Sequence, residues 1–273
     1  MDDQRPRSGF TDVDRENSPE NFVELLDLQQ NMTFVQRYKQ RAHTLLDIQS
    51  GQQILDAGAG TGEDAREMAA KVAPMGQVVG LDLSLVMVKT AQQRNQGTSL
   101  PVHFLQGDIQ HLSFANNSFD RCYADRTFQH LPDPEQALSE LIRITKPDGT
   151  LVIVDPDHET QVLDSPYVEV TRRFIRFRND GMRQPGIAHH LYRLFKEAGL
   201  VDIQVVPMTR VTTDYETIRP VANYIEGMQE AQLNDVVTSD EAEQWIAAME
   251  EAIQSGRFFH AITFFLTCGR KPA

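Results

Sequence analysis

The sequence predicts an α/β protein in which a doubly wound, mostly parallel sheet carries helices on both faces. Short apolar runs that suit buried strands alternate with segments of helical periodicity through residues 50–200. The first run, residues 53–57, enters a turn in which Gly58, Gly60 and Gly62 alternate with other residues. Together, a strand, a glycine turn and a helix indicate a nucleotide-type site at the edge of the sheet.

The spacing of the glycines narrows the ligand. Dinucleotide-binding folds use G-x-G-x-x-G with a pyrophosphate on the helix N-terminus, whereas this turn has G-x-G-x-G preceded by Asp56. A carboxylate at Asp56 would repel a pyrophosphate, but it can order the turn or accept hydrogen bonds from an ammonium group. Asp82 ends the next apolar run, at the distance where an acidic residue binds ribose hydroxyls.

These motifs resemble those of class I S-adenosylmethionine (SAM) dependent methyltransferases. The resemblance rests on D-x-G-x-G-x-G at residues 56–62, Asp82, and Gly107-Asp108 after the third strand, and it covers residues 50–155 best. It implies a Rossmann-like, seven-stranded sheet with a helical lid, SAM as cofactor and S-adenosylhomocysteine (SAH) as product. The residues it implies around SAM are Asp56, Ala57, Gly58, Ala59, Gly60, Thr61, Gly62, Asp82, Leu83, Met87, Gly107, Asp108, Ile109, Asp125 and Arg126.

Composition limits the partners. A formal charge of -13 and a pI near 5.0 argue against a broad nucleic-acid-binding surface. Residues 172–178 interleave Arg with Phe, and we favour an amphipathic helix over a basic patch there. Cys122 and Cys268 lie in apolar runs and are expected to be buried thiols rather than a disulfide or a metal pair. With no signal-type or membrane-length apolar run and no metal-ligand spacing, we expect a cytoplasmic, metal-free protein without a membrane partner.

The N-terminal residues 1–48 are expected to cover the SAM site. Residues 1–18 are polar and predict a mobile arm, and helical periodicity then begins at Ser18-Pro19, an expected N-cap and first helical position. Two helices are predicted before the first strand. In the resembled family such helices often lie across the pocket, so Phe34, Tyr38 and Arg41 are candidates to face a ligand, with core packing or surface exposure as the alternatives.

The remaining elements follow in alternation. Ser84 and Pro134 are predicted to open helices, and Asp148-Gly149 stands where the family has a glycine pair. Strands are predicted at 53–57, 78–82, 102–106, 119–124, 151–155, 201–211 and 258–268, and helices at 63–72, 85–96, from 134, and at 187–198.

The loop after the fourth strand, residues 125–134, lies at the carboxyl edge of the sheet, where ligands bind in this architecture. In many small-molecule methyltransferases a histidine occupies this position, so the resemblance suggests His130 as the base; packing beneath the Pro132–Pro134 turn is the alternative. Arg126 is expected to meet a carboxylate of SAM or substrate, or else to pair with Asp125.

Two insertions, residues 159–186 and 213–256, interrupt the methyltransferase domain predicted at 49–273. They are expected to form a lid that determines specificity, with a dimer surface as the alternative. The residues predicted to contact substrate are Phe34, Tyr38, Phe128, His158, Tyr215, Tyr224 and Trp245.

The sequence therefore predicts a methyltransferase acting on an O, N or C nucleophile of a small metabolite, with natural-product biosynthesis as one setting. The chain is expected to be a monomer or a homodimer. Two alternatives stay open: a SAM-binding enzyme that catalyses a non-methylating reaction, and a noncatalytic binding protein of the same fold.

Overall fold

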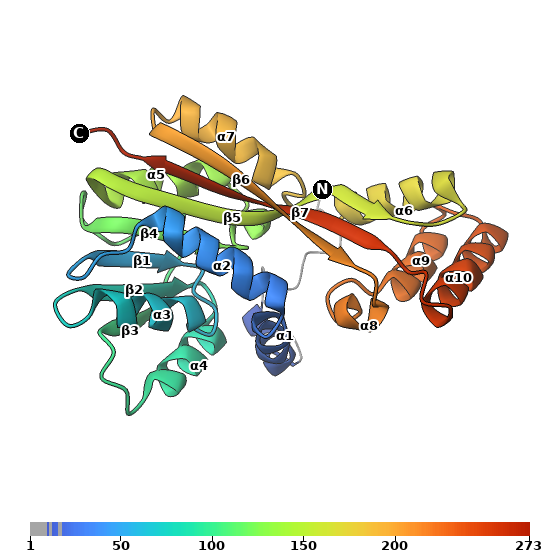
Figure 1. Ribbon diagram of the computed structural model, residues 1–273, viewed down its shortest axis with the longest axis horizontal. Helices are drawn as coiled ribbons and strands as arrows, with labels where there is room; N and C mark the ends of the chain where they lie inside the picture. Colours follow the sequence, from blue (N-terminus) through green and yellow to red (C-terminus); the bar gives the residue numbers. More distant parts are fainter. Residues whose placement is uncertain (1–9, 11–12, 16–17) are drawn as a thin grey trace.

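A seven-stranded sheet organises the protein (Figure 1). The computed structural model describes residues 10, 13–15 and 18–273. The strand order is β3-β2-β1-β4-β5-β7-β6; β7 is antiparallel to both its neighbours, and the other pairs are parallel. The strands are β1 Gln53–Ala57, β2 Gln77–Asp82, β3 Val102–Gln106, β4 Phe119–Asp125, β5 Thr145–Leu163, β6 Val201–Thr212 and β7 His260–Arg270. The predicted fold class is confirmed.

Helices cover both faces of the sheet, because each buried strand presents apolar side chains to both sides. In β1, Ile54 belongs to the core beneath α2 and α3, whereas Leu55 belongs to the core beneath α5 and α7. The side chains of Ser84 and Asp133 cap α4 and α5 by accepting hydrogen bonds from backbone N–H groups in the first turn of each helix. These helices are α1 Glu20–Gln30, α2 Thr33–Leu46, α3 Glu63–Val72, α4 Leu85–Asn95, α5 Pro134–Ile144 and α7 Ile187–Glu197.

The N-terminal segment differs from the prediction at the start of its first α-helix and within the predicted arm, residues 1–18. The helix begins at Glu20 with Pro19 as its N-cap and no capping side chain, so the predicted cap at Ser18 is wrong. Within the predicted mobile arm, the described residues include a short 3₁₀ helix, η2 Val13–Arg15; residues 1–9, 11–12 and 16–17 lie outside the described part of the chain.

Strand β5 is longer than predicted. It continues past residue 155 to Leu163 and resumes pairing with β7 at Val162 and Leu163 after a register shift. The polar stretch Asp157–Gln161 hides this extension in the sequence. The segment predicted as an insertion from residue 159 therefore begins as part of a long ribbon that projects from the sheet (Figure 1).

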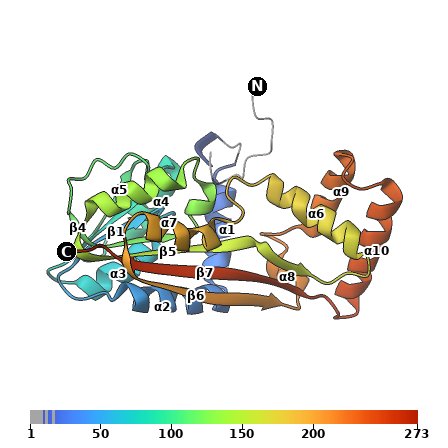
Figure 2. The same ribbon diagram turned by 90° about the horizontal axis from the view of Figure 1, so that it is seen from above.

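The two predicted insertions form a helical body at the end of that ribbon, shown from above in Figure 2. Its helices are α6 Val168–Asp180, α8 Tyr215–Ile218, α9 Tyr224–Leu233 and α10 Ser239–Gln254. They enclose a separate hydrophobic cluster around Trp245, whose indole N–H donates to Thr171 Oγ1 at 2.9 Å. We call this body the lid.

Several smaller predictions are also settled. Cys122 and Cys268 are buried free thiols. The Arg-Phe segment forms α6, with Phe174 buried and Arg172 exposed, as an amphipathic helix requires. Asp148 adopts a left-handed turn conformation with φ 62°. Within the described residues, no helix is both long and apolar enough to cross a membrane.

Candidate active site

A cavity of about 1030 Å³ extends from the glycine turn to the lid. It lies at the carboxyl ends of β1 and β4, where the strand order changes direction and open α/β sheets bind ligands. Thirteen of the fifteen residues predicted around SAM line it, as do His130, His158 and Tyr224. The two exceptions in the glycine turn are Ala57, in the core, and Gly62, the N-cap of α3.

The glycine turn wraps closely around one end of the cavity. Gly58 has φ 84°, and a Cβ there would overlap the Thr127 hydroxyl. Gly60 has φ 52°, and its N–H donates to Asp82 Oδ2 at 2.8 Å. Gly58 therefore requires glycine, because a side chain there would overlap Thr127, and the positive φ of Gly60 also favours glycine.

Carboxylates dominate this end. The Lys39 ammonium, from α2, donates to Asp64 Oδ2 and lies 3.6 Å from Asp125 Oδ2. Asp56 Oδ2 and Asp125 Oδ1 are buried and accept no hydrogen bond from the described residues. Burial, and next the negative charge of Asp64, raise the pKa of Asp56 well above its usual value. The glycine end thus presents unsatisfied oxygen atoms that a ligand with N–H donors would complete.

Arg126 and His130 border the middle of the cavity. Arg126 has φ 53°, rare for a non-glycine residue, and its guanidinium donates to Asp125 Oδ2 at 3.2 Å and to Gln29 of α1. Of the two predicted partners for Arg126, a ligand carboxylate or Asp125, the structure shows the ion pair with Asp125. His130 ends the short helix η3, Phe128–His130, and burial, Arg126 and Arg183 lower its pKa to about 4. The His130 imidazole is therefore neutral at pH 7.

His158 lies farther toward the lid, on β5, and is fixed by two amides. Its Nε2 is 3.0 Å from Gln129 Oε1, and its Nδ1 is 3.1 Å from Gln161 Nε2. These partners select the neutral tautomer with hydrogen on Nε2, since the Gln129 oxygen can only accept. Burial, with His130 and nearby arginines, lowers the pKa of His158 to about 3.

Three charged or polar residues at the lid end were missed by the sequence interpretation of the site: Arg178 of α6, Arg210 of β6 and His260 of β7. Strand alternation was the available signal. Arg210 falls in phase with Val206 and Met208, and His260 in phase with Ile262 and Phe264, so both lie on the face that is otherwise apolar. Lys39 was missed too, although it lies in the buried stripe of α2.

Five residues predicted to face substrate do not line the cavity. Phe128 is in the core under the sheet, and Tyr215 and Trp245 are in the core of the lid. Phe34 and Tyr38 pack against Phe264; the Tyr38 hydroxyl donates to Asp125 Oδ2 at 3.0 Å and so orients the wall from behind. These side chains pack inward because a large aromatic residue buries more apolar area in a closed core than at a solvent-filled cavity. Arg41 is exposed.

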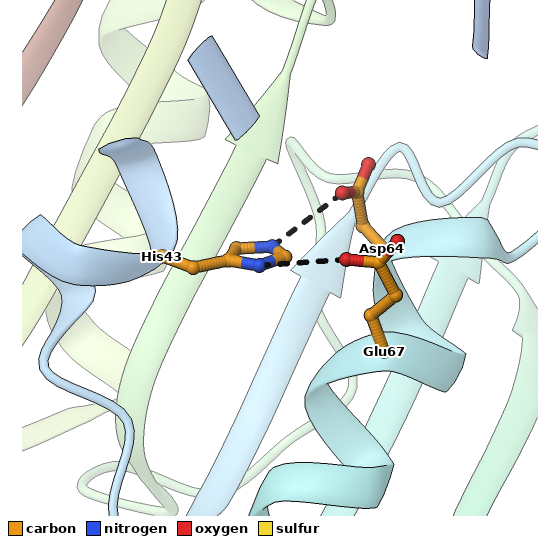
Figure 3. Close-up of side chains that lie close together, drawn as sticks. All are labelled: His43, Asp64 and Glu67. Atoms are coloured by element: carbon orange, nitrogen blue, oxygen red, sulfur yellow. Dashed lines mark ion pairs between the residues drawn. The ribbon is translucent and has the colours of Figure 1, made fainter. Parts of the chain in front are cut away.

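A histidine–carboxylate cluster lies behind the Lys39 side of the cavity. Figure 3 shows His43 of α2 between Asp64 and Glu67 of α3, with His43 Nε2 3.4 Å from Asp64 Oδ1 and Nδ1 3.8 Å from Glu67 Oε2. These atoms are close enough to hold a cation. However, Lys39 pairs with Asp64, and Lys71 Nζ lies 3.0 Å from His43 Nδ1. Two ammonium groups already balance the carboxylates, so we assign the cluster to holding α2 against α3.

Comparisons with known proteins agree with this architecture. A protein-family model described as "Methyltransferase domain" matches residues 48–199, more than half of the 273 residues. An uncharacterised 37.1 kDa protein in transposon TN4556 of Streptomyces fradiae is 32% identical over 246 residues, 89% of this chain and 70% of the relative. A demethylmenaquinone methyltransferase of Geobacillus kaustophilus is 30% identical over 181 residues, 60% of this chain and 77% of the relative.

A solved structure shares the fold. Haemonchus contortus phosphoethanolamine N-methyltransferase 2, in complex with phosphomonomethylethanolamine and SAH, aligns with a TM-score of 0.62 at 20% identity, covering 97% of this chain and 61% of that one. By sequence and fold, this chain belongs to the class I SAM-dependent methyltransferases.

Proposed function

We propose that this protein transfers the methyl group of SAM to an O, N or C nucleophile of a small-molecule metabolite. The observation that carries the proposal is the single cavity, which joins the glycine turn and its unsatisfied carboxylate oxygens to a compartment beneath the lid that contains neutral histidines. Related demethylmenaquinone methyltransferases, which are named for a small-molecule substrate, support this class of acceptor.

The glycine end fits SAM. Asp56 Oδ2 and Asp125 Oδ1 lack donors, and the ammonium group of SAM would supply them. Asp82, at the end of β2, would bind ribose hydroxyls, and Met87 and Ile109 offer apolar surface for the adenine. When bound, SAM supplies an electrophilic methyl group on a sulfonium.

The residues of the protein must supply everything else that methyl transfer requires. Direct displacement requires alignment of the nucleophile, exclusion of water and, for a hydroxyl or ammonium acceptor, removal of a proton. We propose His130 as the residue that takes that proton, because it lines the cavity and its imidazole is neutral at pH 7. His158, whose two ring nitrogens have amide partners, would instead help to order this wall of the cavity.

Water would be excluded by the segments that cover the cavity. Phe10, Val13, Leu25 and Leu26 contribute its wall from the N-terminal side, and residues of α6 and α9 from the lid side. We therefore propose residues 1–48 as a cover over SAM, and residues 159–186 and 213–256 as the lid over the acceptor.

The test is calorimetric titration with SAM and SAH, followed by incubation with metabolite pools and mass spectrometry. Binding near micromolar and a product heavier by one methyl group are expected. A product of unchanged mass whose formation needs SAM would replace this proposal with a non-methylating enzyme. Absence of SAM and SAH binding by folded protein would favour a noncatalytic protein.

A further inference from the structure

The lid end of the cavity contains two arginines that no acidic side chain of the described residues pairs with. Arg178 and Arg210 both line the cavity, and within the described residues neither guanidinium lies within 4.0 Å of a carboxylate. Other arginines of this acidic chain do have such partners, as Arg94 has in Asp27 and Arg173 in Glu241. In the described part of the chain Arg37 and Arg41 have no such partner either, but they are exposed, whereas Arg178 and Arg210 are half-buried and line the cavity.

Arg210 is half-buried, which is unusual for a cation that has no carboxylate partner among the described residues. Its register partner on β7 is Ile262, and the paired side chains lie on the same face as Met208 and Phe264. Its Nε is buried without a hydrogen-bond partner among the described residues. Burial of a guanidinium without a counter-ion is costly, and here burial lowers the pKa of Arg210.

His260 lies on the same face of the β6–β7 hairpin, opposite Thr212. His260 lines the cavity and is only 1% exposed. Neither of its ring nitrogens has a hydrogen-bond partner in the described part of the chain. A neutral imidazole has one N–H donor, so His260 offers a buried donor next to the guanidiniums.

The Tyr224 ring of α9 contacts both Arg178 and His260. Arg178 Cζ lies 5.1 Å from the centre of its ring, and the His260 ring lies 5.5 Å from it. Gly227, one turn along α9, leaves room for Arg178, because a Cβ there would lie 2.5 Å from Nη1. The stacking on Tyr224 and Phe174 positions the guanidinium but leaves its N–H donors without a carboxylate.

Two acidic residues on the cavity wall, Asp180 and Glu230, do not provide the missing charge. Both are exposed, and Asp180 pairs with Arg176 on the outside of α6. The N–H donors of Arg178, Arg210 and His260 are therefore suited to an acceptor group on a ligand.

We propose that the methyl acceptor carries an anionic oxygen group, a carboxylate or a phosphate, and that Arg178, Arg210 and His260 bind this group beneath the lid. The inference rests on the proposed function for the identity of the ligand as acceptor, but anion binding at this place is testable without it. Guanidinium groups suit both oxyanions, since each can accept two parallel N–H donors.

The experiment is a calorimetric titration of the full chain, with and without SAH, using benzoate and phenyl phosphate as probes and benzamide and phenol as their neutral counterparts. The charged probes are expected to bind at least about tenfold more tightly than the neutral ones, as expected for charge-assisted hydrogen bonds. Preference for benzoate would assign the acceptor group as a carboxylate, and preference for phenyl phosphate as a phosphate ester.

The matched variants are Arg210→Met, within the site, and Arg172→Met, on the exposed side of α6. Arg210→Met is expected to weaken the preferred charged probe by about tenfold or more, while its melting temperature stays unchanged or rises because no ion pair is broken. Arg172→Met is expected to bind like the wild type.

Equal binding of charged and neutral probes, no binding of either anion, or unchanged anion affinity in Arg210→Met would each overturn the inference. The probes are also titrated without SAH, so anion binding is measured whether or not the protein binds a cofactor. Failure to bind SAM would contradict the proposed function but would leave the anion site to be decided by the probe titration.

Discussion

The two ends of the cavity carry opposite charge. At the glycine end Asp56, Asp64, Asp82 and Asp125 line the cavity with Lys39, and Asp56 Oδ2 and Asp125 Oδ1 accept no hydrogen bond from the described residues. At the lid end Arg178 and Arg210 have no carboxylate partner among the described residues, and His260 has two unsatisfied nitrogens.

Opposite charge at its two ends lets one cavity distinguish two ligands. A buried polar group without a protein partner favours a ligand of complementary chemistry, because that ligand can supply the missing hydrogen bond. The glycine end complements the ammonium and sulfonium of SAM, and under our inference the lid end complements an anionic acceptor. The opposed charges would therefore orient the acceptor with its anion away from the cofactor.

The largest effect is expected at the glycine end. Gly60→Val would place a branched side chain at φ 52° in the turn and abolish measurable SAM binding in a calorimetric titration. The control Gly97→Val has the same strain at φ 76° but open space around it, and should bind SAM normally. Unchanged affinity in Gly60→Val would refute the placement of SAM at this turn.

A substitution at His130, in the middle of the cavity, should affect turnover but not SAM affinity. His130→Ala is expected to lower turnover by about 10²- to 10⁴-fold, as for loss of a general base, with SAM affinity nearly unchanged. The control His103→Ala removes an exposed imidazole on β3, away from the cavity, and should keep full turnover. Equal turnover in both variants would move His130 to a packing role.

Stability should respond oppositely to loss of a cation at the two ends. Lys39→Met leaves the buried Asp64 carboxylate without its ammonium partner and should lower the free energy of unfolding by about 3–5 kcal/mol in urea titrations. The exposed control Lys89→Met should change it by no more than about 0.5 kcal/mol. A small effect of Lys39→Met would show that the glycine end is not organised by this ion pair.

The lid end should show a specific pH dependence. Burial, Arg210 and Arg178 lower the pKa of His260 from 6.5 to about 4, so between these values the unfolded chain binds the proton and the folded protein does not. His260 thus contributes stability above pH 6.5 that is lost as pH falls toward 4. Compared with wild type, His260→Gln should lose less stability across this window, by up to about 1.4 kcal/mol per pH unit. Identical slopes would contradict a buried neutral His260.

The smallest effect is expected where the N-terminal segment meets the fold. Asp14 Oδ2 accepts the Leu85 N–H at 2.8 Å and so caps α4 from outside the sheet, with the buried Val13 against the cavity. Asp14→Ala should cost about 1 kcal/mol of stability and weaken SAM severalfold. The control Asp133→Ala removes the cap of α5 and should cost similar stability without changing SAM affinity. Unchanged SAM affinity in Asp14→Ala would contradict a covering role for this segment.

The sequence predicted the glycine end far better than the lid end, for a physical reason. β1 and α3 have local signals, namely an apolar run, glycines at fixed spacing and helical periodicity, and their predicted bounds agree with the structure. Lid aromatics such as Trp245 have periodicity too, but periodicity does not tell whether the apolar face meets a cavity or another helix. Trp245 packs against Phe174 of the other insertion, a contact that depends on how distant segments meet.

The most direct test of the account is calorimetric titration of the full chain with SAM and SAH, with folding verified in the same sample. The account predicts one site per chain with affinity near micromolar, lost in Gly60→Val and retained in Gly97→Val. Failure of folded wild-type protein to bind either ligand would contradict the central claim that the glycine turn and its carboxylates form a SAM site.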